Sequence, residues 1–194
     1  MKHRYTKTLG IMAALAIIPT AARATPPIGY TSQSTRTQIT SNLYSTQWGT
    51  SPLFNFVVQT SSSAWGYDLI HATNTFAAAP ANGTPSQSGW HDHPVPIGLV
   101  QVVQGGVWMQ ESDAPSCLTY YPTGSMFIEG AGHAHNVFNL SQKTAAVTTA
   151  TWFLERYLTS QRRDQPDPTT GSTTLASPPP TELCTGSPVP PATQ

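Results

Sequence analysis

Charged residues are scarce in this sequence, and they form no basic cluster. Only 9% of the 194 residues are Asp, Glu, Lys or Arg. The one adjacent basic pair, Arg162 and Arg163, is followed at once by Asp164. Proteins that bind nucleic acids or anionic membranes carry dense Lys/Arg patches. The composition therefore argues against both kinds of partner, and the abundant Ser, Thr, Gln and Asn residues indicate a neutral polar surface.

Long hydrophobic runs are also missing. The most apolar stretch, Leu9–Ile18, follows a basic start to the chain. It has about half of the roughly 20 residues that a membrane helix needs. The residues Ala22–Ala24 then show the small-x-small pattern that signal peptidase accepts. We therefore expect residues 1–24 to be a secretory signal peptide, cleaved after Ala24, and the mature protein to be exported to the periplasm or secreted.

Cysteine is nearly absent, since Cys117 and Cys184 are the only two. Two cysteines alone do not make a structural zinc site, and their spacing is not that of a CxxC redox motif. In an oxidising compartment, a pair with none left over predicts one disulfide, whereas two free thiols are the alternative. The disulfide would close a loop of 184 − 117 = 67 residues. Such a loop is worth roughly 4 kcal/mol on the chain-entropy model.

Helical periodicity is absent from the central part of the chain. Short runs of β-branched and aromatic residues alternate there with turn residues, which is typical of a β-sandwich or barrel. The sequence predicts one all-β domain without internal repeats. The predicted strands are Leu53–Gln59, Trp65–Ile70, Leu99–Val103, Val107–Glu111, Cys117–Tyr121, Met126–Ile128, His133–Leu140 and Ala145–Leu154.

The flanking regions carry weaker patterns. A first strand or a short helix is expected around Ile39–Tyr44, a loop over Phe76–Gly89, and a brief helix at Leu154–Gln161. The Pro/Ser/Thr-rich end of the chain cannot bury a core, so we expect it to be extended or disordered except where Cys184 anchors it. The predicted divisions are the signal peptide (1–24), a polar segment (25–50), the β-barrel (51–160) and a disulfide-tethered tail (161–194).

Histidines are few, but four of the six fall in two pairs. His91 is paired with His93, and His133 with His135, with one residue between the partners. On a strand this spacing places both imidazoles on the same face, where they can bind one first-row metal ion. Such pairs often arise by coincidence, but here glycines frame them at turn positions, as the corners of a small barrel require.

With these residues the sequence resembles the cupin superfamily. The first cupin motif is a Gly, an HxH pair, a Glu and a further Gly one strand later. It is matched here by Gly89, His91, His93 and Gly105. Gly98 stands where the Glu would be. The carboxylate that usually joins the histidines is therefore missing from its position.

The second cupin motif, G-x5-P-x-G-x2-H-x3-N, follows in the expected order. It is matched here by Gly124, Gly132, His135 and Asn139. Gly130 replaces the proline. Two motifs in order, with a short segment between them, make the resemblance fairly specific.

The resemblance covers roughly Leu53–Leu154 and implies an all-β, single-domain cupin barrel, also called a double-stranded β-helix or jelly roll. It further implies that His91, His93 and His135 bind a divalent metal ion. Iron is the first candidate, and manganese or zinc are the alternatives. The resemblance assigns no catalytic residue.

Three other polar residues are candidates to support the site or to replace the missing carboxylate. Gln101 shares the odd-numbered phase of His91 and His93, and Glu129 and His133 lie near the second motif. For Glu129 we favour the simpler interpretation, a solvated turn residue. For His133, a place at the rim of the barrel and a functional role are equally plausible.

Two functions follow from a cupin with this site. The first is a dioxygenase-like enzyme, because a metal held by three neutral imidazoles keeps open coordination positions for a small organic substrate. The missing carboxylate leaves that metal more electrophilic, which favours an anionic or enolate-like substrate. The second is non-catalytic binding of a sugar or other metabolite, which the scarcity of acidic and basic side chains favours. A structural protein with vestigial histidines is a third interpretation, and a homodimer is compatible with all of them.

Overall fold

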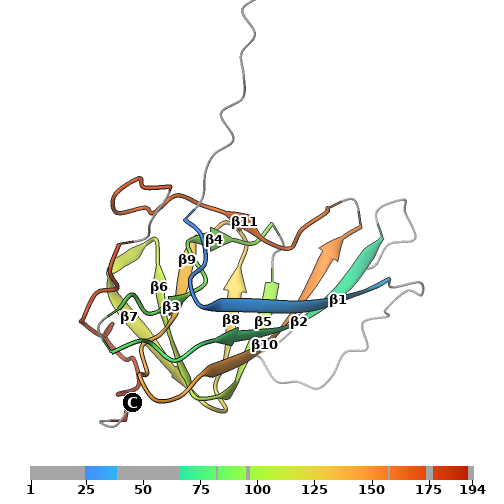
Figure 1. Cartoon of the computed structure of the whole chain (residues 1–194). Helices are drawn as coiled ribbons and strands as arrows, with labels where there is room; N and C mark the ends of the chain where they lie inside the picture. Colours follow the sequence, from blue (N-terminus) through green and yellow to red (C-terminus); the bar gives the residue numbers. More distant parts are fainter. Residues whose placement is uncertain are drawn as a thin grey trace, which may run out of the picture.

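The computed structural model describes residues 25–38, 66–81, 83–94, 97–156, 158–173 and 177–191. The expected signal peptide, the predicted strand Leu53–Gln59 and the element around Ile39–Tyr44 lie outside these ranges. Within them the chain forms strands and no helix, so it contains no helix long and apolar enough to cross a membrane (Figure 1). The strands are β1 (Tyr30–Gln38), β2 (Tyr67–Phe76), β3 (Ser86–Gln87), β4 (His91–Asp92), β5 (Ile97–Gln104), β6 (Gly106–Glu111), β7 (Ala114–Pro122), β8 (Met126–Gly130), β9 (His135–Asn139), β10 (Ala146–Glu155) and β11 (Arg163–Asp164).

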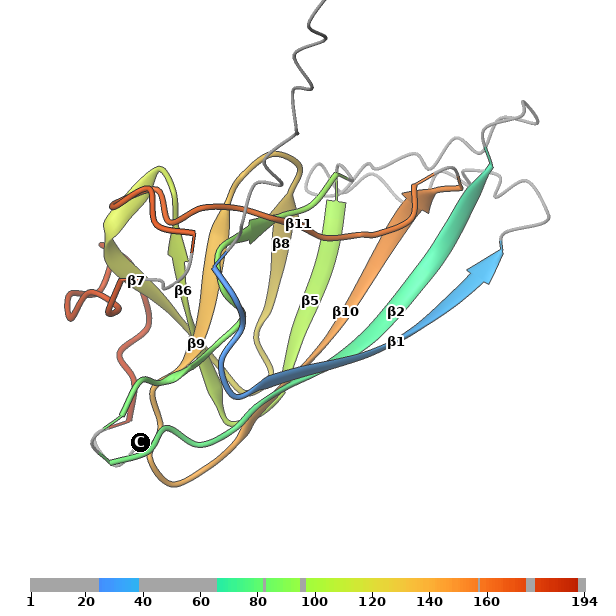
Figure 2. The same ribbon diagram turned by 45° about the horizontal axis from the view of Figure 1, so that its top comes forward.

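The strands form two antiparallel sheets that face each other (Figures 1 and 2). The first has the order β1-β2-β10-β5-β8, and the second has the order β11-β4-β9-β6-β7, with β3 beside β9. Without the outer strands β1 and β11, this leaves β2-β10-β5-β8 against β4-β9-β6-β7. Successive strands change repeatedly between the sheets, which is the topology of a jelly-roll barrel. The all-β fold class predicted from the sequence is confirmed.

Alternating side chains fill the barrel. Along β10 every second residue is buried, and β2 shows the same pattern over most of its length. This alternation is the burial pattern expected of strands with one face in a core. Complete burial of one Val, Leu or Phe side chain contributes about 1.5–3 kcal/mol. The interior core consists of Ile70, Ala72, Phe76, Val100, Val102, Val107, Met109, Phe127, Val137, Ala146, Ala150, Trp152 and Leu154.

A second, smaller core lies on the outer face of the second sheet. Trp108, Leu118, Tyr120 and Phe138 form it, and Leu183 of the tail packs against them. The tail runs beside β7, where the backbone of Leu118 donates to Glu182 and accepts from Cys184. Cys184 is bonded to Cys117, as predicted. The tail therefore covers apolar side chains that the barrel would otherwise expose.

Three local expectations differ from the structure. The brief helix at Leu154–Gln161 is wrong, because β10 continues through Leu154, which the core buries, to Glu155. The expected loop over Phe76–Gly89 contains the short strand β3, paired with β9. In the polar N-terminal segment, β1 pairs with β2 along its whole length although nearly all its residues are exposed. A strand held by backbone pairing at a sheet edge leaves little hydrophobic pattern in its sequence.

Candidate metal centre

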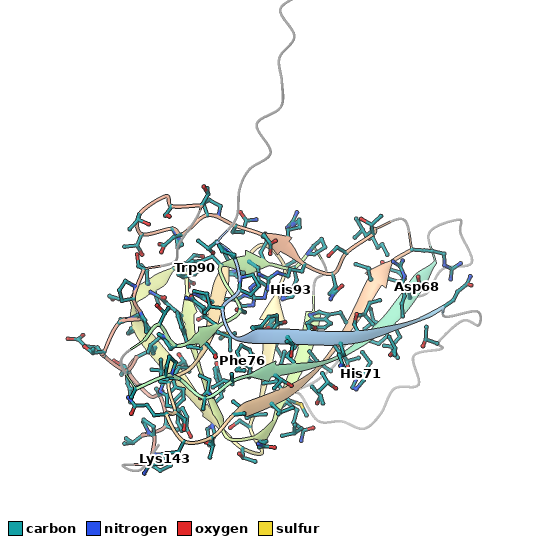
Figure 3. All side chains as sticks on the ribbon, viewed as in Figure 1. Asp68, His71, Phe76, Trp90, His93 and Lys143 are labelled. Carbon is teal, nitrogen blue, oxygen red and sulfur yellow. A yellow bond between two sulfur atoms is a disulfide. The ribbon has the colours of Figure 1, made fainter. Side chains whose placement is uncertain are left out.

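The three histidines of the two motifs meet inside the barrel. His91 on β4 pairs directly with His135 at the start of β9, and His93 lies just beyond β4. All three are buried, with exposed fractions of 6%, 3% and 2% for His91, His135 and His93. Their ligand nitrogens all lie within 4.8 Å of one another. Figure 3 shows His93 within the barrel, whereas His71, outside the two pairs, is exposed on β2.

Backbone carbonyls fix the tautomer of all three rings. A carbonyl oxygen only accepts hydrogen bonds, so the facing Nδ1 must carry the proton. In a neutral imidazole this leaves a free lone pair on Nε2, the arrangement seen in histidines that bind metals. The Nδ1 groups of His91, His93 and His135 donate to the carbonyls of Gly89 (2.9 Å), Gln161 (2.6 Å) and His133 (3.0 Å), respectively.

Glu129 on β8 supplies a carboxylate to this cluster. Its Oε2 lies 3.0 Å from Nε2 of His93, and its Oε1 lies 3.3 Å from Nε2 of His135. The expectation of a solvated turn residue is wrong, because only 7% of Glu129 is exposed. The glycines that follow indicated a turn, but β8 continues through Glu129 and turns its side chain inward, as it does for Phe127.

These close contacts do not have the geometry of hydrogen bonds. Nε2 of His93, Nε2 of His135 and Oε2 of Glu129 have no hydrogen-bond partner within the described ranges. Buried polar atoms without partners are costly and rare. Two atoms that each lie about 2.1 Å from a shared metal ion are roughly 3.0–3.4 Å apart. The two distances from Glu129 match this spacing, so the residues present fit a metal ion.

The charges of the site also suit a cation. Burial alone would raise the pKa of Glu129, but the adjacent imidazoles of His135 and His93 outweigh it and hold this pKa well below its usual range. Burial, together with the charges of His135 and Arg162, lowers the pKa of His91 well below its usual range. The site thus combines an ionised carboxylate with a neutral imidazole donor. This mixed set suits divalent first-row metals.

Trp152 explains why the carboxylate does not come from position 98. A Cβ atom at Gly98 would lie 2.2 Å from Nε1 of Trp152, so no larger residue fits there. The indole instead stacks on His93, with ring centroids 5.1 Å apart. Glu129 is the residue directly opposite Gly98 in the pairing of β8 with β5. The acidic side chain therefore comes from the neighbouring strand, at the same level of the barrel.

The other two predicted residues do not place their side chains in the site. Gln101 is exposed on the outer face of β5, because the phase of His91 and His93 does not carry across the turn into another sheet. The side chain of His133 is 63% exposed and lies 4.0 Å from Asp113. Only the carbonyl of His133 serves the site, through His135.

The comparisons with known proteins concern the fold. No protein-family model matches this chain, and neither does any curated protein. An oxalate oxidase structure matches at 19% identity and a TM-score of 0.37, over 44% of this chain and 42% of that one. A structure of the DMSP lyases RdDddP and RnDddQII matches at 19% identity and 0.39, over 52% and 51%. A double-stranded β-helix protein from Klebsiella pneumoniae matches at 14% identity and 0.38, over 47% and 76%.

Likenesses at these levels say nothing about activity, and this chain spans about half the length of the first two proteins. The strand order described above is that of a double-stranded β-helix, or jelly roll, as predicted from the sequence. This chain has the jelly-roll barrel fold that the cupins share.

A small pocket adjoins His91 and His93 in this barrel. Its volume of about 30 Å³ is enough for roughly two water molecules. Sequence patterns did not indicate most of its lining, because the residues come from the polar N-terminal segment, β2, β10 and the tail. The polar residues that line it, besides the histidines and Glu129, are Tyr30, Ser32, Asn74, Ser88, Thr148, Gln161 and Arg162.

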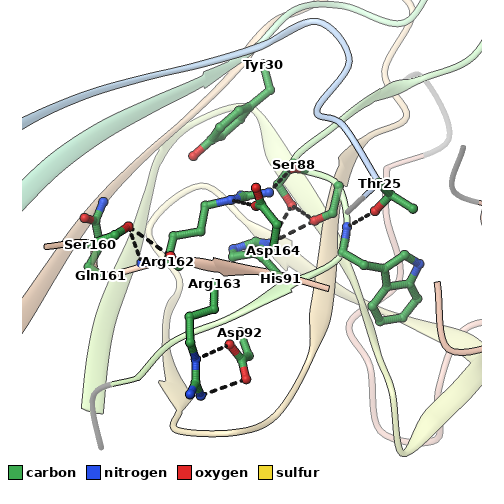
Figure 4. Close-up of polar contacts among 12 residues, drawn as sticks. Thr25, Tyr30, Ser88, His91, Asp92, Ser160, Gln161, Arg162, Arg163 and Asp164 are labelled. Atoms are coloured by element: carbon green, nitrogen blue, oxygen red, sulfur yellow. Dashed lines mark hydrogen bonds and ion pairs between the residues drawn. The ribbon is translucent and has the colours of Figure 1, made fainter. Parts of the chain in front are cut away.

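Residues 161–165, which we call the strap, close one side of the site (Figure 4). The carbonyl of Gln161 holds His93, and Arg162 Nη2 donates to the carbonyl of Ser88 at 2.7 Å. Arg163 forms two 2.9 Å hydrogen bonds with Asp92, the residue between His91 and His93. The tail thus takes part in building the site.

Proposed function

We propose that this protein is a metal-dependent cupin that binds a divalent cation through His91, His93, His135 and Glu129. The observation that carries the proposal is the convergence of three buried histidines. Beside them, Nε2 of His93, Nε2 of His135 and Oε2 of Glu129 have no hydrogen-bond partner among the described residues. Iron remains the first candidate, with manganese or zinc as alternatives, because imidazole and carboxylate ligands suit all three.

We further propose that the site performs dioxygenase-like chemistry on a small organic substrate. When bound, such a metal supplies a Lewis acid with coordination positions for small ligands. The chain itself would orient the imidazole rings, keep Glu129 ionised and limit the substrate to what the small pocket admits. The pocket admits only a small molecule or the reactive end of a larger one.

Non-catalytic binding of a small ligand is the second candidate. It is favoured by the lack of an unengaged general acid or base among the described pocket residues. Tyr30 donates to Asn74 at 3.0 Å, and burial raises the pKa of Tyr30, so its proton is held firmly. Oxygen uptake with diketones, thiols and phenols separates the two: turnover with bound metal supports the enzyme, and binding without turnover supports the alternative.

Elemental analysis of the purified full chain tests metal binding directly. We expect close to one metal ion per chain and a melting temperature that falls by several degrees when a chelator removes it. The variants His91→Ala and His135→Ala should lose the metal. The control His71→Ala changes an exposed histidine on β2 and should retain it. Metal-free wild-type protein that takes up no metal when supplied with iron, manganese or zinc would overturn the proposal.

We also propose that the protein is exported after cleavage following Ala24. The support is the disulfide Cys117–Cys184, which is typical of an oxidising compartment, together with the N-terminal pattern. The mass of the protein purified from cells tests this. An N-terminus at Thr25 in the extracytoplasmic fraction is expected, and uncleaved protein confined to the cytoplasm would refute it.

A further inference from the structure

Two hydrogen-bond donors in the pocket lack a partner. Among the described residues, Nη1 of Arg162 and Nε1 of Trp152 are buried side-chain nitrogens with no acceptor within reach. Both residues line the same pocket as His91 and His93. Two unused N–H donors, one from the strap and one from β10, therefore belong to residues of one pocket lining.

The guanidinium of Arg162 is held in a fixed orientation. Its Nε pairs with Asp164, and its Nη2 donates to the carbonyl of Ser88. These two contacts use one edge of the planar group and leave Nη1 free. A buried donor without an acceptor is costly and rare, so a retained one indicates an absent partner. Guanidinium groups bind carboxylates especially well because donors and oxygens match in geometry and charge.

Trp152 adds a donor where the first cupin motif would place an acid. The absence of a side chain at Gly98 makes room for its indole, and Nε1 lies over that position. An indole nitrogen donates and never accepts. An N–H donor therefore stands where the motif has a carboxylate, and this donor attracts a hydrogen-bond acceptor. The stacking of the indole on His93 fixes the orientation of the ring.

We propose that this pocket binds a small carboxylate anion, with Arg162 and Trp152 as its hydrogen-bond donors beside the metal. The substrate class would be small carboxylic acids. This rests on the proposed function in one respect: a divalent cation offsets the negative charge of Glu129, which would otherwise repel the anion. The small pocket accommodates a carboxylate with few further atoms, so acetate is a suitable probe.

Calorimetric titration of the metal-loaded full chain tests the proposal, with sodium acetate as probe and acetamide as its neutral analogue. Wild-type protein should bind acetate at least about tenfold more tightly than acetamide, as expected for hydrogen bonds to a charged group. Trp152→Phe keeps the stacked ring but removes the N–H, and should weaken acetate binding about fivefold or more. Arg162→Gln should weaken it about tenfold or more.

Arg36→Gln is the matched control, since this arginine pairs with Asp68 near the end of β1 and does not line the pocket. It should bind acetate like the wild type. If Arg162→Gln fails to fold, Trp152→Phe decides. Acetate affinity that is unchanged in the folded variants, or equal for acetate and acetamide, would overturn the proposal.

Metal content is measured on every sample, so the two hypotheses fail separately. Acetate binding that chelation abolishes but that neither Trp152→Phe nor Arg162→Gln affects would mean binding to the metal alone, and would overturn the carboxylate site. Acetate binding that depends on Arg162 in a chain that retains no metal would uphold the carboxylate site and refute the metal-dependent function.

Discussion

Gly98 and Glu129 face each other across β5 and β8, and this pair explains how the barrel keeps an acid beside the histidines. The indole of Trp152 fills the space next to Gly98 and leaves room for no side chain. The opposite strand then supplies the carboxylate at the same height. The residue paired with Gly98 across the two strands thus provides the acidic group.

Removing the charge of Glu129 tests its role as a ligand. Glu129→Gln preserves size and shape, but an amide oxygen is a weaker ligand than a carboxylate. We expect metal affinity to fall by about tenfold or more, a loss of the size seen when supporting groups around metals are removed. Competition with a chromogenic chelator measures this. Glu182→Gln, at an exposed position of the tail, is the control, and equal affinity of both variants would contradict the assignment.

The contact between Gly98 and Trp152 predicts a steric effect. In Gly98→Ala the new methyl group meets the indole at a distance that real structures do not tolerate, so the ring must shift. Overpacking of this kind costs about 1–3 kcal/mol of unfolding free energy. Urea unfolding measures the loss, and adding Trp152→Leu should recover part of it. A stability equal to that of the wild type would show that the indole moves freely.

At the scale of elements, the strap and the segment that follows it depend on polar contacts. Asp167 is fully buried just beyond the strap. Its Oδ1 accepts from the backbone N–H of Thr169 at 2.8 Å, and its Oδ2 accepts from that of Ser177 at 2.6 Å. One carboxylate therefore joins the residues just after the strap to Ser177, from which the tail runs on to the disulfide.

These contacts predict a pH dependence. Burial alone would raise the pKa of Asp167, but the N–H donors of Ser177 and Thr169 outweigh it and lower the pKa. The stabilisation is therefore complete above the ordinary pKa of about 3.9 and disappears as the pH falls through the lower folded-state value. Asp167→Asn should lose about 1–3 kcal/mol at neutral pH, and its deficit should shrink as the pH falls below about 3.9 and the wild-type carboxylate takes up a proton. A deficit that does not shrink in urea unfolding across the acid range in which the chain still folds would argue against it.

At the scale of the whole molecule, the sequence predicted what lies within a motif and missed what comes from separate elements. The spacing of His91 and His93 predicted a shared face, because side chains alternate on a strand, whereas their convergence with His135 was implied by the resemblance to the cupins. Glu129 was misjudged because the adjacent glycines resemble a turn. Arg162 and Trp152 line one pocket only through the folding of the tail and β10, and no local pattern encodes that arrangement. The homodimer remains a prediction.

The two attachments of the tail predict that stability and metal binding can be separated. The disulfide anchors the end of the tail on β7, over the outer core, whereas the strap is held independently by Arg163, Asp92 and the pairing of β11 with β4.

Replacing both Cys117 and Cys184 with Ala opens a loop of 67 residues and should cost about 4 kcal/mol of unfolding free energy. Metal affinity should stay within about twofold, because the strap contacts remain, and β7 carries none of the proposed ligands. Urea unfolding and chelator competition on the same variant measure the two quantities. A parallel loss of metal affinity in a variant that is still folded would mean that the far end of the tail, and not the strap alone, holds His93 in place.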